Sequence, residues 1–183
     1  MSDSLRHRLR ALPDFPDRLP AFDPALAPKD PVELFLAWFE NALAVGVPQP
    51  HAFSLATATA EAVVSSRMLI LKNIEPAASG AAAGVDFGAW QFASTRGSRK
   101  GRELGINPRA AMNFYWAGLG RQVRVVGEVS LLSAEASALD WEQRPGADGR
   151  VNPDWQLYEL HPAEVEFWQA SADRHHIRHR YVL

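Results

Sequence analysis

The sequence predicts an α+β protein in which antiparallel strands form a closed or nearly closed β-barrel with a few peripheral helices. Several segments alternate apolar and polar residues with the period of two that half-buried strands show. Helical segments with recognisable caps are few and lie between these strands. The chain has 183 residues, of which 47% are hydrophobic, enough to fill one domain with a sizeable core.

Charge and composition exclude several classes of function. The formal net charge is −2, so no large basic field exists for binding nucleic acid or an anionic membrane. The absence of cysteine excludes disulfides and thiolate metal sites and is compatible with a reducing cytoplasm. No apolar stretch follows the basic N-terminus as in a secretory signal, and none approaches the ~20 residues that span a bilayer. We therefore expect a soluble, cytoplasmic protein.

The first 29 residues differ in composition from the helix that is predicted to follow them. Residues 1–29 contain five prolines at near-regular intervals, which predicts an extended arm over a surface or a disordered leader rather than a long helix. The domain proper then spans residues 30–183. Asp30-Pro31 supplies an N-cap and a proline at the first helical position, and Gly46 ends the predicted helix.

Strand patterns dominate the rest of the chain. The predicted strands are Ala52–Ala58, Ala62–Lys72, Val85–Phe92, Ala110–Trp116, Gln122–Leu132 and Trp155–Trp168. A short turn at about Thr59–Glu61 joins the first two, and Pro76–Gly84 is an Ala/Gly/Ser-rich loop. Ser133 can cap a helix that runs to Gln143, and Arg144-Pro145-Gly146 ends it.

The segment Gly97–Leu104 is the most informative stretch. It predicts a tight turn after a strand and then a short helix whose first turn carries Arg99 and Lys100. Unpaired N–H groups and the helix dipole favour an anion there, which Arg99 can bind in a bidentate manner and Lys100 as a point charge. A basic first turn is more often only a solvated surface, so both interpretations stay open.

Three further positions carry candidate functional groups. Arg67 lies among apolar residues, where an unpaired cation is costly, so it either binds an anion or is a solvated strand charge. Lys72 is five residues further along the same strand and points to the opposite face. Gln122 offers a donor and an acceptor that suit the edge of a heteroaromatic ring, although polar residues are common at strand starts.

The tail from Glu166 to Arg180 is dense in aromatic, imidazole and guanidinium groups. His175 and His179 share a face, which raises the possibility of a metal site. The neighbouring arginines increase the cost of binding a divalent cation, so we expect no metal. An anionic or electron-accepting ring held against Trp168 fits this composition better.

Five motifs in register carry a family resemblance. They are Arg67-Met-Leu-Ile-Leu-Lys72, Gly97-Ser-Arg-Lys100, Arg121-Gln122-Val, Arg144-Pro145, and Glu166-Phe-Trp168-Gln with Arg174-His-His176-Ile-Arg178. In order and approximate spacing the chain resembles the pyridoxamine 5′-phosphate oxidases from about residue 30 to its end. That family also includes phenazine-biosynthesis flavin oxidases. The resemblance implies an FMN-binding split β-barrel, antiparallel and Greek-key-like, with peripheral helices.

The resemblance also implies an activity and its residues. Hydride would pass from pyridoxine or pyridoxamine 5′-phosphate to FMN, with reoxidation by dioxygen, at sites shared by the two chains of a homodimer. The implied FMN ligands are Arg67, Ala93, Ser94, Arg99, Lys100, Gln122, Trp168 and Arg178. Lys72 and Arg144 would bind the substrate phosphate. Arg174 and His176 would be the catalytic residues over the substrate ring, and they project the same way if their segment is extended.

The chain departs from the family pattern in three places. Asp140 stands where the family has a phosphate-binding tyrosine, and its charge would repel a substrate phosphate. The segment Gly146–Pro153 is short and the sequence stops at Leu183, as in a minimal relative or a sequence that lacks segments. Two alternatives therefore accompany the oxidase interpretation: a flavin oxidase acting on a phenazine-like metabolite, and a flavin- or haem-binding barrel without turnover.

Overall fold

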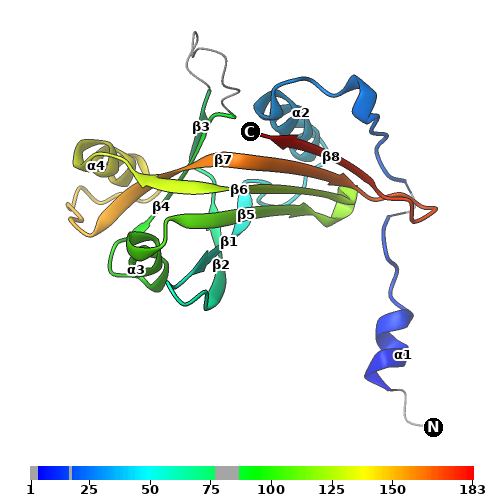
Figure 1. The fold of residues 1–183 in the computed structure, drawn as a ribbon, viewed down its shortest axis with the longest axis horizontal. Helices are drawn as coiled ribbons and strands as arrows, with labels where there is room; N and C mark the ends of the chain where they lie inside the picture. Colours follow the sequence, from blue (N-terminus) through cyan, green and yellow to red (C-terminus); the bar gives the residue numbers. More distant parts are fainter. Residues whose placement is uncertain (1–3, 17, 77–86) are drawn as a thin grey trace.

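The computed structural model describes residues 4–16, 18–76 and 87–183. A single curled antiparallel sheet forms the body, with strand order β2-β1-β5-β6-β7-β4-β3 and with β8 paired to β7 (Figure 1). The strands are β1 (Ala52–Ala58), β2 (Val64–Ile70), β3 (Asn73–Glu75), β4 (Ala89–Thr95), β5 (Arg109–Trp116), β6 (Arg121–Leu131), β7 (Trp155–Gln169) and β8 (Ile177–Val182). The helices are α1 (Leu5–Arg10), η1 (Pro24–Leu26), α2 (Pro31–Ala44), α3 (Arg99–Ile106), η2 (Ala117–Leu119) and α4 (Ala134–Gln143).

The chain between β2 and β3 brings the two edges of the sheet together. The backbone N–H of Leu71 donates to the carbonyl of His51, next to β1, at 2.9 Å. The next residue, Lys72, donates its N–H to the carbonyl of Gln91 in β4 at 2.8 Å. Consecutive residues therefore bond to the chain beside β1 and to β4, which lie next to the two opposite edge strands of the curled sheet. This bridge makes the barrel nearly closed, and the predicted α+β barrel with peripheral helices is confirmed.

Helix α2 packs its apolar stripe into the core, as the sequence predicts. Asp30 caps it by accepting from the N–H of Val32 at 2.8 Å, and a proline occupies its first turn. Phe35 on this helix is almost fully buried, and its ring centre lies 4.6 Å from that of Trp90 and 5.1 Å from that of Phe114. Aromatic contacts thus fasten the helix to β4 and β5.

A bulge in β7, where Ala163 has no partner on β6, allows the two long strands to stay paired on either side of it. The register between β6 and β7 shifts at Val126/Gly127, where Gly127 lies opposite Pro162. A Cβ atom on Gly127 would clash with the carbonyl oxygen of His161, so only glycine fits at this position. β7 is 15 residues long and reaches from one end of the barrel to the other.

Two predicted strands differ from the structure by more than one residue at an end. β4 begins at Ala89, after Gly88 with φ +71°, and it continues to Thr95 instead of ending at Phe92. Val85 and the loop 77–84 lie outside the described residues. The predicted strand from Ala62 to Lys72 is shorter, because Ala62 has φ +61° and belongs to the preceding turn.

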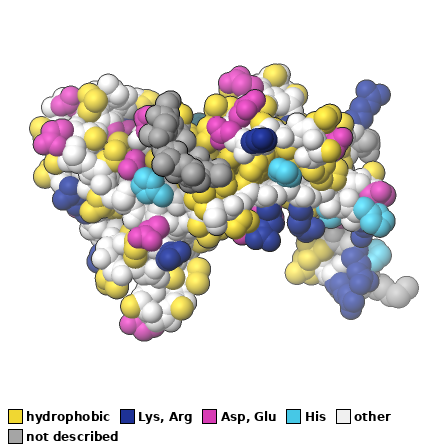
Figure 2. Space-filling view, turned by 45° about the horizontal axis from the view of Figure 1, so that its top comes forward, with side chains coloured by type: hydrophobic (Ala, Val, Ile, Leu, Met, Phe, Trp, Pro, Cys, Tyr) yellow, Lys and Arg dark blue, Asp and Glu magenta, His cyan; other side chains and the backbone are white. Residues whose placement is uncertain are grey.

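The N-terminal region contains a helix that proline spacing did not predict. Ser4 caps α1, and the helix ends at Arg10, before Pro13. The prolines that prevent a long helix further along the chain therefore lie outside it. Figure 1 shows α1 standing away from the sheet, and Figure 2 shows basic side chains gathered there. Elsewhere on that face, acidic and basic groups are interspersed (Figure 2). The strand β8, which pairs with β7 from Glu164 to Gln169, was also not predicted.

Candidate functional site

The first turn of α3 lies directly against the end of β4. Ser98 caps the helix by accepting from the N–H of Gly101 at 3.2 Å. A Cβ atom on Gly101 would clash with the carbonyl oxygen of Arg96, so glycine is required for this close approach. Lys100 Nζ lies 3.3 Å from Ser98 Oγ, which in turn lies 3.3 Å from Ser94 Oγ. Two hydroxyls and an ammonium group therefore converge at the predicted anion site.

Arg67 reaches the same region from β2 and is satisfied by groups of the chain itself. Its Nη1 donates to Thr57 Oγ1 at 2.6 Å and to the carbonyl of Leu55 at 3.2 Å. Its Nη2 donates to Ser65 Oγ at 2.5 Å and lies 3.4 Å from Glu103 Oε2. The cost of placing a cation among apolar neighbours is thus met by these acceptors, with or without a bound anion.

Glu103 on α3 links two of the predicted anion-binding cations. Its side chain is only 5% exposed, and it accepts from Arg99 Nε at 2.7 Å as well as from Ser65 Oγ at 2.8 Å. The hydrogen bond from the Thr57 hydroxyl, with help from Arg99 and Ser65, lowers the pKa of Glu103 to about 2. Sequence analysis missed this carboxylate, although its position four residues after Arg99 on a helix was a usable signal.

The cluster carries an excess of positive charge. Arg67 and Arg99 contact the carboxylate of Glu103, and Lys100 lies within the influence of the charge of Arg67, so three cations accompany one carboxylate. Burial and the neighbouring charge of Arg67 lower the pKa of Lys100, so an added anion would stabilise its charged form. Ala93, which was predicted to line this site, is buried beside Ser94 in β4. Cations, hydroxyls and a helix N-terminus together suit a phosphate group.

A second group of predicted residues meets at the other end of β7. Gln122 on β6 lies opposite Trp168 on β7, and Trp168 lies opposite Arg178 on β8. The ring of His176 is 4.8 Å from that of Trp168. They share a cavity of about 470 Å³, lined by Phe15, Tyr115, Gln122, Arg124, Glu166, Trp168, His176 and Arg178. The structure therefore brings together four of the five residues assigned to the flavin ring and the substrate ring, without Arg174.

The N-terminal arm covers part of this cavity, which sequence analysis did not anticipate. The ring centre of Phe15 lies 5.8 Å from that of Trp168 and 5.5 Å from that of His176. Nδ1 of His176 accepts from the N–H of Ser171 at 3.1 Å, so in the neutral ring Nε2 carries the proton. The backbone thus fixes both the orientation and the tautomer of the imidazole.

Arg174 does not line that cavity. It has φ +64° and lies in the turn between β7 and β8, so the premise of an extended segment is wrong for this residue. Its Nη2 is 2.5 Å from Oδ2 of Asp14 in the N-terminal arm. The side chain of His176 therefore lies in the ring cavity, whereas that of Arg174 contacts the N-terminal arm. The catalytic assignment of Arg174 stays a prediction.

The two cations expected to bind a substrate phosphate are engaged separately. Lys72 Nζ lies 3.2 Å from Asp140 Oδ1, at the edge of a cavity of about 500 Å³. The guanidinium of Arg144 lies 3.4 Å from the ring centre of Trp141. Lys72 lines the cavity and Arg144 does not. The structure does not bring this pair into one pocket.

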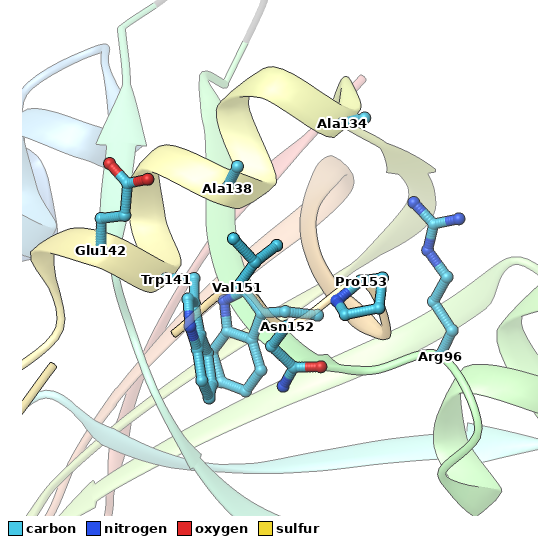
Figure 3. A pocket seen from close by; sticks show the side chains of 9 residues that line it. Arg96, Ala134, Ala138, Trp141, Glu142, Val151, Asn152 and Pro153 are labelled. Carbon is cyan, nitrogen blue, oxygen red and sulfur yellow. The ribbon is translucent and has the colours of Figure 1, made fainter. Parts of the chain in front are cut away.

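A further cavity of about 350 Å³ lies on the other side of α4 (Figure 3). The rings of Trp141 and Trp155, 5.1 Å apart, form its apolar wall, and Figure 3 shows Arg96 and Glu142 at opposite ends. None of the predicted site residues lines it. The two predicted clusters therefore remain the candidate functional site.

Residues 4–16, 18–76 and 87–183 contain neither a metal site nor a membrane-spanning helix. No three His, Asp or Glu side chains of these ranges come together as a metal site requires. No helix within them is long and apolar enough to cross a bilayer.

Known proteins share both the sequence pattern and the fold. A family model described as pyridoxamine 5′-phosphate oxidase matches residues 39–169. A pyridoxine/pyridoxamine 5′-phosphate oxidase from Bordetella petrii is 32% identical over 85% of this chain and 84% of its own length. The chain is thus similar to named oxidases over most of its sequence.

Two solved structures resemble the fold. PhzG from Burkholderia lata, in complex with tetrahydrophenazine-1-carboxylic acid, superposes with a TM-score of 0.76 at 26% identity, covering 90% of this chain and 93% of PhzG. An FMN-binding protein from Nostoc punctiforme, related to pyridoxamine 5′-phosphate oxidase, gives a TM-score of 0.60 at 14% identity, with coverage of 88% and 100%. Together with the match over residues 39–169, these similarities show that the chain belongs to the pyridoxamine 5′-phosphate oxidase family.

Proposed function

We propose that this protein is an FMN-dependent oxidase that removes a hydride from a carbon atom of its substrate. The observation that carries the proposal is the convergence of Arg67, Arg99 and Lys100 with two hydroxyls at the start of α3. This cluster has the charge and the donors that a phosphate dianion requires. The aromatic cavity around Trp168 offers a matching place for a flat ring.

The residues of the ring cavity fit the second half of FMN. Gln122 can donate to and accept from the edge of the isoalloxazine, while Arg178 supplies positive charge nearby. When bound, FMN accepts a hydride from a substrate carbon and passes the two electrons to dioxygen. Positive side chains favour the negative charge of the reduced ring, and His176 is held where it can orient a substrate. The chain therefore binds, orients and stabilises, and it needs no carboxylate base.

The separation of the two clusters supports a homodimer with shared sites. Ser94 pairs with Gln156 near the start of β7, and Gln122 pairs with Trp168 near its end. These positions are twelve residues apart (156 to 168), ~40 Å along a strand, which exceeds the length of one FMN. Figure 1 likewise shows α3 and the β7–β8 turn at opposite ends of the sheet. A second chain, related by a two-fold axis, would supply the missing half of each site.

The outer face of the sheet offers a surface for that second chain. Met68 on β2 is 65% exposed and lies in one row with Ser54 on β1 and Asn113 on β5. Asn113 Oδ1 is the only buried side-chain polar atom that lacks a hydrogen-bond partner in the described part of the chain. Covering this row would bury the exposed apolar side chain of Met68.

Two substrate classes are compatible with the proposed reaction. The curated relatives are named for pyridoxine and pyridoxamine 5′-phosphate, which makes these compounds the first candidates. A reduced ring without a phosphate, as in the PhzG complex, is the second candidate. The ion pair between Lys72 and Asp140 favours the second, because it occupies the cation that a substrate phosphate would need.

The direct test is spectroscopic. Purified protein should be yellow, or should take up one FMN per chain on titration. Under anaerobic conditions, addition of a substrate should bleach the flavin absorption, and admission of dioxygen should restore it. Colourless protein that takes up no FMN would contradict the proposal.

A further inference from the structure

The cavity beside Lys72 has a charge balance that is unusual for a phosphate pocket. It lies between α4 and the strands β3 and β4, with a volume of about 500 Å³. Its ionisable lining groups are one cation, Lys72, and two carboxylates, Asp140 and Glu75. Their formal charges sum to −1. An arriving phosphate dianion would therefore meet a site of the same sign as its own.

Asp140 is held firmly in the position where it neutralises Lys72. Its Oδ1 lies 3.2 Å from Lys72 Nζ, and its Oδ2 accepts from Trp155 Nε1 at 2.8 Å. The side chains of Lys72 and Asp140 are 19% and 15% exposed, so solvent screens their attraction only partly. The ammonium also lies 5.9 Å from the ring centre of Trp155. Both carboxylate oxygens are thus used, and rotation away from Lys72 would break two interactions.

Arg144, the second residue expected to bind the substrate phosphate, cannot replace the positive charge of Lys72 that Asp140 neutralises. The guanidinium of Arg144 stacks on the ring of Trp141, with 3.4 Å between them. Trp141 lines the cavity on the opposite side of α4, with Glu142, as Figure 3 shows. No free cation from the described residues therefore lines the cavity beside Lys72.

We infer that the substrate of the proposed flavin reaction presents an uncharged polar group, and not a phosphate, to the cavity beside Lys72 and Asp140. This inference rests on the proposed function and names the substrate class for it. The paired charges offer a hydrogen-bond donor in Lys72 and an acceptor in Asp140, which suit a hydroxyl or an amide. A phosphate would have to displace Asp140 or accept its repulsion.

The test compares pyridoxine 5′-phosphate with pyridoxine, which differ only in the phosphate. Stopped-flow reduction of the FMN-loaded protein gives a rate constant for each compound, and calorimetric titration of the cofactor-free protein gives an affinity. The wild type should show no preference for the phosphate ester in either measurement. Asp140→Asn keeps the shape of the side chain and removes its charge. It should raise the preference for the ester about 10- to 100-fold.

Two further variants test the cause of that gain. In the double variant Lys72→Met/Asp140→Asn the gain should disappear, because the released Lys72 ammonium is the group that binds the phosphate. Glu142→Gln removes one negative charge from the other side of α4 and should leave the preference unchanged. The wild-type comparison remains decisive even if Asp140→Asn does not fold.

The outcomes separate this inference from the proposed function. A wild-type preference for the ester of tenfold or more, or an unchanged preference in folded Asp140→Asn, overturns the inference. Protein that takes up no FMN, or whose flavin neither compound reduces, contradicts the proposed function instead. In that case the calorimetric preference of wild type and variant still decides the role of Asp140.

Discussion

Nη2 of Arg67 lies 3.4 Å from Oε2 of Glu103, so a buried carboxylate joins β2 to α3 beneath the predicted phosphate site. The same carboxylate accepts from Arg99 Nε at 2.7 Å. The negative charge of Glu103 reduces the attraction of the site for phosphate. The same carboxylate holds Arg67 and Arg99 in place before any ligand binds. Such preorganisation lowers the cost of ordering side chains on binding. Glu103 is therefore expected to affect both folding and cofactor affinity.

The free energy of unfolding should depend on Glu103 at acid pH. Its pKa in the folded protein is about 2, below the ordinary value of 4.5, so the unfolded chain binds the extra proton. The resulting stabilisation is fully present above pH 4.5 and is lost as the pH falls from 4.5 to 2. Urea unfolding of Glu103→Gln between pH 2 and 7 should show a flatter decline than the wild type over that window. Glu142→Gln, which alters an exposed carboxylate, should decline like the wild type; the same decline in Glu103→Gln would contradict the assignment.

Arg99→Ala should weaken FMN binding by about 10- to 100-fold. Only its Nε is used by Glu103, and the side chain is 58% exposed, so its other donors remain for a phosphate. Charge-assisted hydrogen bonds contribute ~1.5–3 kcal/mol each, which corresponds to that loss. Fluorescence titration with FMN and with riboflavin, which has no phosphate, separates the two parts of the cofactor. Riboflavin affinity should not change, and the exposed Arg109→Ala should affect neither ligand. An equal loss of riboflavin would show that the phosphate assignment is wrong.

Much of the fold follows from periodicity and capping. The bounds of β1 were predicted without error, and α2 and α4 begin at the positions that Asp30 and Ser133 cap. Two of the errors fall where glycine or a positive φ interrupts a strand, at Gly88 and Ala62. Apolar alternation continues through such residues in the sequence, so the pattern alone does not reveal the break.

The candidate site was predicted less completely. Residue type and order identified the cations of the α3 cluster and the aromatic group around Trp168. They did not reveal Glu103, whose partners Thr57 and Ser65 lie on other strands. They also did not reveal that Phe15 covers the ring cavity, because contacts between distant segments depend on the folded chain. The ion pair between Lys72 and Asp140 also joins distant segments, so it was not predicted for the same reason.

Met68→Lys should dissociate the proposed homodimer. Met68 is 65% exposed on the outer face of β2, and a lysine there would place a charge in the interface. Sedimentation should show a monomer of 20.2 kDa with weakened FMN binding, while circular dichroism stays native. Leu26→Lys alters a leucine in η1 that is exposed even more than Met68, and it should leave assembly unchanged. A monomeric wild type that holds FMN tightly would rule out shared sites.

His176→Ala should slow flavin reduction by roughly 100-fold while FMN affinity changes little. The imidazole is fixed by the N–H of Ser171 and packs on Trp168 inside the ring cavity, so its loss removes a positioned group without disturbing the phosphate cluster. His175→Ala is the matched control, because that side chain is 90% exposed and should contribute nothing measurable. Stopped-flow reduction under anaerobic conditions measures the step directly.

Arg174→Ala distinguishes a catalytic role from a structural one. If Arg174 contacts the substrate, its loss should slow reduction as much as His176→Ala does, whereas Asp14→Ala should have no such effect. If its main role is the ion pair with Asp14, the two variants should behave alike, because each one releases the arm that carries Phe15. Quenching of Trp168 fluorescence by iodide reports that release independently of turnover, since Phe15 packs on its ring. Full activity in the double variant Arg174→Ala/His176→Ala would show that neither residue acts on the substrate.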